Sequence, residues 1–176
     1  MDITLLVNVT ARAWSLDILT RIAEGTPCRQ APLIAATGAG RTAFAASLSH
    51  LMSLGLLERN PGHGHPLRPE FRLTQDGERI APIAARIIGT VRNRPEAPLL
   101  RRSWTVPVLV VTAQPCFFGE IRQKLTPITD RALSQSLLNL ETEKMVEREV
   151  DTTARPPRPS YCAVDLGSRI AQAVVA

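Results

Sequence analysis

Apolar residues between Thr126 and Val150 recur with the period of an α-helix. Leu133, Leu137 and Leu140 follow one another at i, i+4 and i+7, which predicts a single apolar stripe. The opposite side of the predicted helix is polar and carries Arg131, Ser134, Gln135 and Asn139. A helix of this kind packs on a core through its stripe and leaves hydrogen-bonding groups free for a partner.

The start of this helix is also marked in the sequence. Thr129 is a favourable N-cap, and Asp130 places a negative charge in the first turn. Ile128 precedes the cap and is placed to pack on Leu133 as a hydrophobic staple. These signals predict that the helix begins just after Thr129.

A second, shorter amphipathic segment, CFFGEIRQKL, lies immediately upstream. Phe118, Ile121 and Leu125 share one of its faces, and Thr126-Pro127 separates it from the next helix. Two short helices joined by a tight turn predict a helix-turn-helix, whose second helix enters a DNA groove. DNA is therefore a candidate partner for the polar face.

The chain repeats itself, because segments of its first half match segments of its second half in the same order. The matched pairs are AWSLDIL at 13–19 with SWTVPVL at 103–109, Pro27-Cys28 with Pro115-Cys116, ASLSHLMSLGLLER at 46–59 with QSLLNLETEKMVER at 135–148, RPEF at 68–71 with RPSY at 158–161, and DGERIA at 76–81 with LGSRIA at 166–171. Agreement in this order indicates an internal duplication.

Each copy has the same predicted order of elements. A helix led by tryptophan comes first, followed by the two helices of the helix-turn-helix, a strand, a turn rich in Pro, Gly and Arg, a second strand and a closing helix. Two strands joined by a polar loop after a recognition helix form the hairpin of a winged helix. We therefore expect an α+β fold, mainly helical, with tandem winged helix-turn-helix domains at 1–90 and 103–176. Pro95 and Pro98 fall in the expected linker, 91–102.

Composition supports a folded, basic protein. The chain has 176 residues, 44% of them hydrophobic, with a net charge of +5. Its mean hydropathy of +0.00 argues against a membrane protein or a disordered acidic tail, and no secretory signal is visible. Its positive residues are almost all arginine, which suits phosphates and guanine edges. Three cysteines without scaffold spacing fit a reducing cytoplasm.

The second copy resembles the HxlR-type winged-helix transcriptional regulators, which are related to the MarR group. The resemblance rests on Trp104, FGEIRQKL, ITDRALSQSLLNLE, MVEREV and PPRPSY, and the first copy looks like a degraded form of the same pattern. It implies a bacterial DNA-binding regulator. Family members usually have one such domain, bind as homodimers and often carry a cysteine near the N-terminus. This chain has two fused copies and lacks that cysteine.

Candidate DNA-contacting residues of the second copy follow from the docking of a winged helix. The early residues of the recognition helix meet base edges, while the wing meets phosphates or the minor groove. We assign Arg131, Ser134 and Gln135 to bases, Asn139 to the groove edge, and Thr129 to both the cap and a phosphate. The wing contributes Arg148, Arg155 and Arg158.

The first copy offers a corresponding set. Its recognition helix carries Arg41, Thr42, Ser47 and His50, and its wing carries Arg59, His63, His65 and Arg68. The helix is rich in alanine and so presents fewer groups that read bases. We expect it to contribute mainly position and affinity, or to serve dimerisation.

The strongest competing motif is GAGRTA at 38–43, which satisfies G-x-G-x-x-A. An apolar run precedes it, a helix follows, and Glu58 lies further along the chain, so the motif alone predicts a dinucleotide site. The matching stretch of the second copy, KLTPITDRA, has no glycine. We therefore interpret Gly38 and Gly40 as the turn and N-cap of a recognition helix.

Other chemistry has weaker support. The cysteines Cys28, Cys116 and Cys162 are candidates for redox sensing, although buried small hydrophobic residues are the commoner outcome. His63 and His65 have no further ligands at metal-site spacing, and no catalytic motif is present. We expect no enzymatic activity, cofactor or metal.

The sequence thus predicts sequence-specific binding of double-stranded DNA for transcriptional control, most simply repression by occlusion of a promoter. One chain then acts as a monomeric pseudo-dimer over two half-sites, or two chains pair as a homodimer. A protein-interaction module is a further alternative. Regulators of this kind often have a small-molecule effector, but no residue here identifies one.

Overall fold

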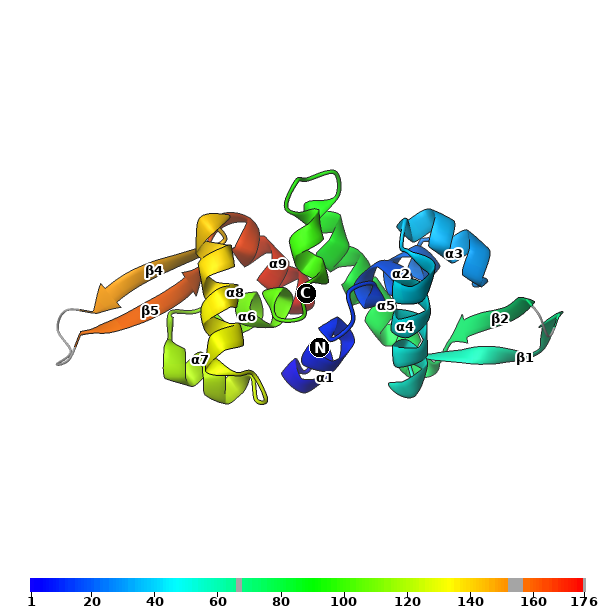
Figure 1. Cartoon of the computed structure of the whole chain (residues 1–176), viewed down its shortest axis with the longest axis horizontal. Helices are drawn as coiled ribbons and strands as arrows, with labels where there is room; N and C mark the ends of the chain where they lie inside the picture. Colours follow the sequence, from blue (N-terminus) through cyan, green and yellow to red (C-terminus); the bar gives the residue numbers. More distant parts are fainter. Residues whose placement is uncertain (66–67, 152–156, 176) are drawn as a thin grey trace.

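A computed structural model describes residues 1–65, 68–151 and 157–175 of the chain, with side chains described outside 61–68 and 151–156 (Figure 1). It contains two winged-helix units. The first comprises α2 (Ser15–Ala23), α3 (Gln30–Thr37), α4 (Arg41–Ser53), β1 (Leu57–His65), β2 (Arg68–Leu73) and α5 (Gln75–Val91). The second comprises α6 (Thr105–Val111), β3 (Cys116–Phe117), α7 (Phe118–Lys124), α8 (Asp130–Thr142), β4 (Val146–Asp151), β5 (Arg158–Ala163) and α9 (Asp165–Val175). The predicted α+β fold, mainly helical, is confirmed.

Each unit has a small antiparallel sheet. In the first, β1 pairs only with β2 among the described residues, whereas the second has the order β3-β5-β4. Each hairpin continues into a closing helix, α5 or α9, which packs on the first helix of its own unit, α2 or α6. The two units therefore repeat one architecture, as the duplication predicts.

The helix-turn-helix elements begin and end where the local sequence signals lie. Gly38 ends α3 with φ of 71°, a left-handed conformation that glycine adopts without steric penalty. Gly40 is the N-cap of α4, and Thr129 is the N-cap of α8, accepting the backbone N–H of Ala132 at 3.2 Å. Ile128 is 5% exposed, as a hydrophobic staple requires. The predicted starts of both recognition helices are confirmed.

Two short elements outside the repeated pattern were not predicted. Helix α1 (Ile3–Thr10) begins at Asp2, whose carboxylate accepts the backbone N–H groups of Thr4 and Leu5. The 3-10 helix η1 (Ala97–Arg101) lies inside the stretch expected to be a linker. Proline does not prevent it, because Pro98 occupies the first turn, where the missing N–H has no partner to lose.

Helices from both units pack together at the centre of the molecule. Helix α5 contacts α9, α1 contacts α6 of the second unit, and η1 contacts α5 of the first. The buried side chains consequently form one cluster that passes through both units. Members of this cluster that come from the helices in contact there include Leu6, Val9, Ile87, Val91, Leu100, Val106, Ile170 and Val174.

Polar contacts add to this junction. The Thr10 hydroxyl donates to the carbonyl of Ser103 at 2.8 Å, and Arg86 Nε donates to the carbonyl of Ala173 at 3.2 Å. The Arg101 guanidinium lies 3.8 Å from the centroid of the Trp14 ring. These contacts join residues far apart in sequence, so they fix the two units relative to one another.

The two units are related by an approximate two-fold axis that runs along the viewing direction of Figure 1. The wings point to opposite ends of the molecule, and both chain termini lie near its centre. Helices α4 and α8 run in opposite directions on either side of this axis. This is the arrangement of a symmetric dimer, made here within one chain.

Candidate nucleic-acid interface

The exposed face of α8 carries a set of polar groups at helical spacing. Arg131, Ser134 and Gln135 are exposed, while Asn139 is half-buried at the edge of this face. Gln135 Nε2 donates to Asn139 Oδ1 at 3.2 Å, which orients the Gln135 amide. A carbonyl oxygen and a second N–H of that amide stay available, which is the pair that adenine recognition needs.

A short turn joins helix α7 to the N-terminus of α8. Arg122 Nε on α7 contacts Asp130 Oδ1 at 2.7 Å, and both side chains are exposed. This pairing balances the negative charge of Asp130 at the N-terminus of α8. Sequence reasoning missed Arg122, although its place on the polar face of CFFGEIRQKL was a signal for it.

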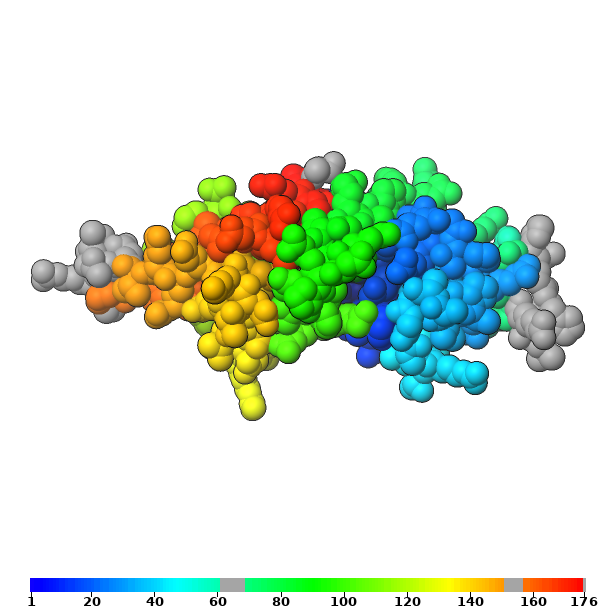
Figure 2. Space-filling model, turned by 90° about the horizontal axis from the view of Figure 1, so that it is seen from above, coloured from blue at the N-terminus to red at the C-terminus, as the bar shows by residue number. Residues whose placement is uncertain are grey.

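Both recognition helices lie on the same side of the molecule. Helix α4 (cyan) and helix α8 (yellow) project from the lower edge of the space-filling view in Figure 2 and lie towards the viewer in Figure 1. One surface therefore presents two helix-turn-helix units.

A family model described as HxlR-like helix-turn-helix matches the chain twice, over residues 9–94 and residues 99–176. The chain belongs to the HxlR-like helix-turn-helix family. It is accordingly a DNA-binding transcriptional regulator with two copies of the family's domain. None of the curated proteins matches the chain. No helix among the described residues is long and apolar enough to cross a membrane.

The first HxlR-like unit presents smaller groups on its recognition helix than the second. Arg41 and Thr42 are exposed at the start of α4. The α4 residues that align with the exposed face of α8 are Thr42, Ala45, Ala46 and Ser49. Alanine offers no hydrogen bond to a base edge, so this face has less capacity for base recognition than the face of α8.

Two residues predicted to contact DNA from α4 make contacts within the protein. Ser47 is 2% exposed, and its hydroxyl accepts the backbone N–H of Trp14 at 3.3 Å. It shares the buried stripe with Phe44 and Leu51, so the expectation that it faces DNA was wrong. His50 is half-buried with Nε2 2.7 Å from the carbonyl oxygen of Asn8, which ties α4 to α1.

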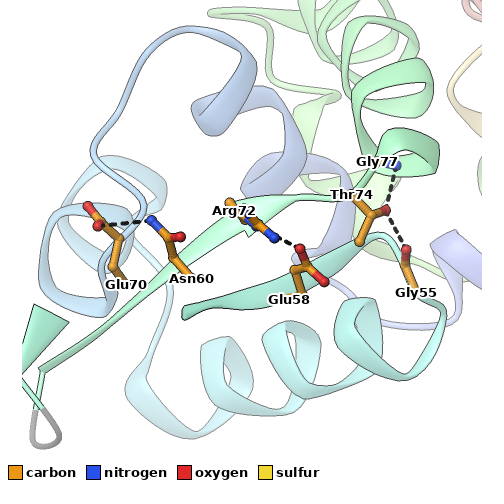
Figure 3. Close-up of polar contacts among 7 residues, drawn as sticks. All are labelled: Gly55, Glu58, Asn60, Glu70, Arg72, Thr74 and Gly77. Carbon is orange, nitrogen blue, oxygen red and sulfur yellow. Dashed lines mark hydrogen bonds and ion pairs between the residues drawn. The ribbon is translucent and has the colours of Figure 1, made fainter. Parts of the chain in front are cut away.

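Both carboxylates of the first wing, Glu58 and Glu70, contact basic groups. Arg72 contacts Glu58 at 2.6 Å across the two strands, and Asn60 donates to Glu70 at 3.4 Å (Figure 3). Arg29 approaches the same Glu70 at 3.7 Å. Two carboxylates thus balance basic groups near this hairpin, which lowers its attraction for phosphates.

Three of the arginines predicted to lie on the wings are exposed. Arg59 lies opposite Phe71 in its hairpin, and Arg148 lies opposite Tyr161 in the other. Both arginines are exposed and occupy equivalent positions near the base of each wing, and Arg158 is exposed at the start of β5. The residues that lie outside the described side chains are His63, His65, Arg68 and Arg155.

The glycine motif lacks the surroundings of a dinucleotide site. The apolar residues before Gly38 form helix α3, whereas a Rossmann phosphate loop follows a strand. Gly38 and Gly40 serve instead as the end of α3 and the start of α4, as the interpretation from the repeat requires.

The three cysteines are free thiols. Burial raises the pKa of the Cys28 thiol, and the neighbouring carboxylate of Glu70 raises it further. Burial also raises the pKa of Cys116, against the opposing effect of Lys124, whose Nζ lies 3.5 Å from Sγ. A raised pKa leaves little thiolate at neutral pH, so neither thiol has the activation typical of a redox sensor.

Proposed function

We propose that this HxlR-like protein binds its operator sequence-specifically as a single chain and represses transcription by covering a promoter. The observation that carries the proposal is the presence of α4 and α8 on one face, related by an approximate two-fold axis. Two recognition helices on one face could each enter the major groove, which returns to the same side of a duplex after one helical turn, about 34 Å.

The junction between the units supports action as one chain. The helices that join the units are α1, α5, η1 and α9, and all of them come from the same polypeptide. Their shared core and the hydrogen bond from Thr10 to Ser103 fix the relation between α4 and α8 without a second molecule. A fused pair of this kind needs no dimerisation step before it occupies two half-sites.

The proposed contacts divide between bases and backbone. Arg131 binds a guanine edge bidentately, Gln135 binds an adenine edge, and Ser134 and Asn139 contact neighbouring groups. Phosphates or the minor groove are contacted by Thr129, Arg122, Arg148, Arg155, Arg158, Arg41, Thr42, Arg59 and Arg68.

The unequal helices imply an operator with unequal halves. Helix α8 supplies hydrogen-bonding side chains to its half-site, while α4 supplies mostly small ones. We therefore propose that the half-site under α8 is the more strictly defined and that the half-site under α4 contributes affinity and spacing. An imperfect palindrome is the expected operator.

Selection from a randomised duplex pool at about 150 mM salt tests this function, because at this ionic strength weak phosphate contacts are largely screened. Wild type is compared with Arg131→Ala/Gln135→Ala, and Thr42→Ala in α4 is the matched control. Each lost base contact should reduce discrimination by about 1–3 kcal/mol, or about 5- to 150-fold. The double variant should therefore lose the α8 half of the motif, and the control should retain it.

Two results would refute parts of the proposal. If wild type enriches no motif and shows only weak, salt-sensitive retention, sequence-specific binding is refuted and a protein-interaction role gains support. If light scattering finds two chains on each operator, the single-chain mode is refuted while specific binding stands. Promoter occlusion is tested separately by transcription in vitro from a promoter that overlaps the selected site.

A further inference from the structure

Leu138 is an exposed leucine in the middle of the α8 recognition face. Its side chain is 58% exposed. The other large hydrophobic residues exposed among the described residues are Val150, on a wing strand, and Val175, near the end of the chain. Of these three exposed residues, Leu138 is the one that lies on a recognition helix.

Helical spacing sets Leu138 among the groups proposed to read bases. It follows Arg131 by seven residues and Ser134 by four, so the three side chains lie on one face. The buried stripe of the same helix consists of Leu133, Leu137 and Leu140, on the opposite side. Leu138 is thus not part of the core, and it projects towards the side where the DNA is proposed to lie.

The major groove offers one apolar group to such a side chain. Among the four base pairs, only those with thymine carry a methyl group on the edge that faces this groove, and apolar side chains contact it. Building on the proposed function, we propose that Leu138 packs on a thymine methyl in the half-site bound by α8. It is a specificity-determining residue that works beside the hydrogen bonds of Arg131 and Gln135.

The equivalent position of the first unit has no leucine. Leu48 of α4 aligns with Leu137 of α8, so Ser49 occupies the position that corresponds to Leu138. Ser49 is exposed but has no apolar surface of comparable size. The contact made by Leu138 therefore has no counterpart at the same position of α4, and this difference orients the chain on its operator.

Replacing thymine by deoxyuridine tests the contact, since it removes the methyl group and leaves every hydrogen-bonding group in place. Each thymine of the selected operator is replaced in turn. Wild type should lose affinity about four-fold at one position under α8, as expected for about one buried methyl group. Leu138→Ala should bind the thymine and deoxyuridine duplexes equally, and Leu138→Met should keep the difference.

Two further variants sharpen the result. Thr142→Ala, on the same exposed face one turn later, is the matched control and should keep the wild-type sensitivity to deoxyuridine. Ser49→Leu should create a second sensitive thymine, under α4. Equal melting temperatures of the variants establish that folding is unchanged.

The possible failures can be told apart. An operator without any deoxyuridine-sensitive position under α8 overturns the thymine contact and leaves the proposed function standing. A sensitive position that persists in Leu138→Ala overturns the role of Leu138. Failure to select any operator overturns both, and it would assign the exposed leucine to a protein partner.

Discussion

Gly167, near the start of α9, has no room for a side chain. A Cβ atom at this position would lie 2.1 Å from the carbonyl oxygen of Met145 and 2.9 Å from Leu109 Cδ2. Ordinary contacts of a Cβ atom lie at 3.4–4 Å. The Met145 carbonyl also accepts the backbone N–H of Val164 at 2.9 Å, so it is held in place. Gly167→Ala must therefore push α9 away from Met145, the residue before β4, by about 1 Å, an overpacking displacement.

The expected cost follows from three contributions. Overpacking of a close contact costs about 1–3 kcal/mol, and weakening the hydrogen bond to Met145 adds about 1 kcal/mol. Alanine recovers about 1 kcal/mol relative to glycine inside a helix. The net destabilisation is about 1–3 kcal/mol, which corresponds to a melting temperature lower by about 2–12 °C for a protein of this size.

Thermal and urea denaturation followed by circular dichroism measure this change. Gly77 is the equivalent residue of the first unit, with its Cβ position 2.0 Å from the carbonyl oxygen of Leu56, so Gly77→Ala should be destabilising as well. Gly89, inside α5, has nothing within 4 Å of its Cβ position, so Gly89→Ala should leave stability unchanged or raise it by up to about 1 kcal/mol. The reasoning is refuted if Gly167→Ala melts at or above the wild-type temperature.

Three further predictions concern a cap, a carboxyl group and a thiol. Thr129→Ala removes the oxygen that caps α8 and should destabilise the protein by about 1 kcal/mol in urea denaturation. Thr129→Ser keeps the oxygen, and equal stability of the two variants would contradict this role. Burial raises the pKa of Asp17 above its usual value of 3.8, with the nearby Arg101 acting in the opposite direction. The folded state then binds the proton more tightly than the unfolded state, so stability falls as pH rises above 3.8 through the folded pKa. Asp17→Asn should remove this part of the pH dependence, and unchanged curves would refute it. Alkylation of Cys116 at about pH 7 should be slow in the folded protein and accelerate in urea, because burial raises its pKa; rapid labelling of the folded protein would oppose this.

Local sequence patterns determined the elements of each unit. The spacing of Leu133, Leu137 and Leu140 set the buried face of α8, and Thr129 set its first turn. Gly38 and Gly40 marked the end of one helix and the start of the next. The order of matched segments determined that the architecture occurs twice. These features depend on residues within a few turns of one another, so a single sequence contains them.

The sequence did not show clearly which residues of α4 are buried and which are exposed. Its alanines blur the contrast between the buried and exposed faces, and Ser47 was placed on the wrong one. Only packing against the first helix of the unit, where Ser47 accepts the N–H of Trp14, decided the matter. Arg122 was missed for a related reason, because its partner Asp130 belongs to a different helix.

The sequence by itself determined two winged-helix units and the polar face of α8. Tertiary structure decided how these units are joined, through α1, η1 and the pairing of α5 with α9. It also decided that both recognition helices share one side of the molecule. The physical reason is that helix formation and capping follow from neighbouring residues. The junction depends on burial shared by side chains far apart in the chain, such as those of α1 and α6, and no local pattern encodes that pairing.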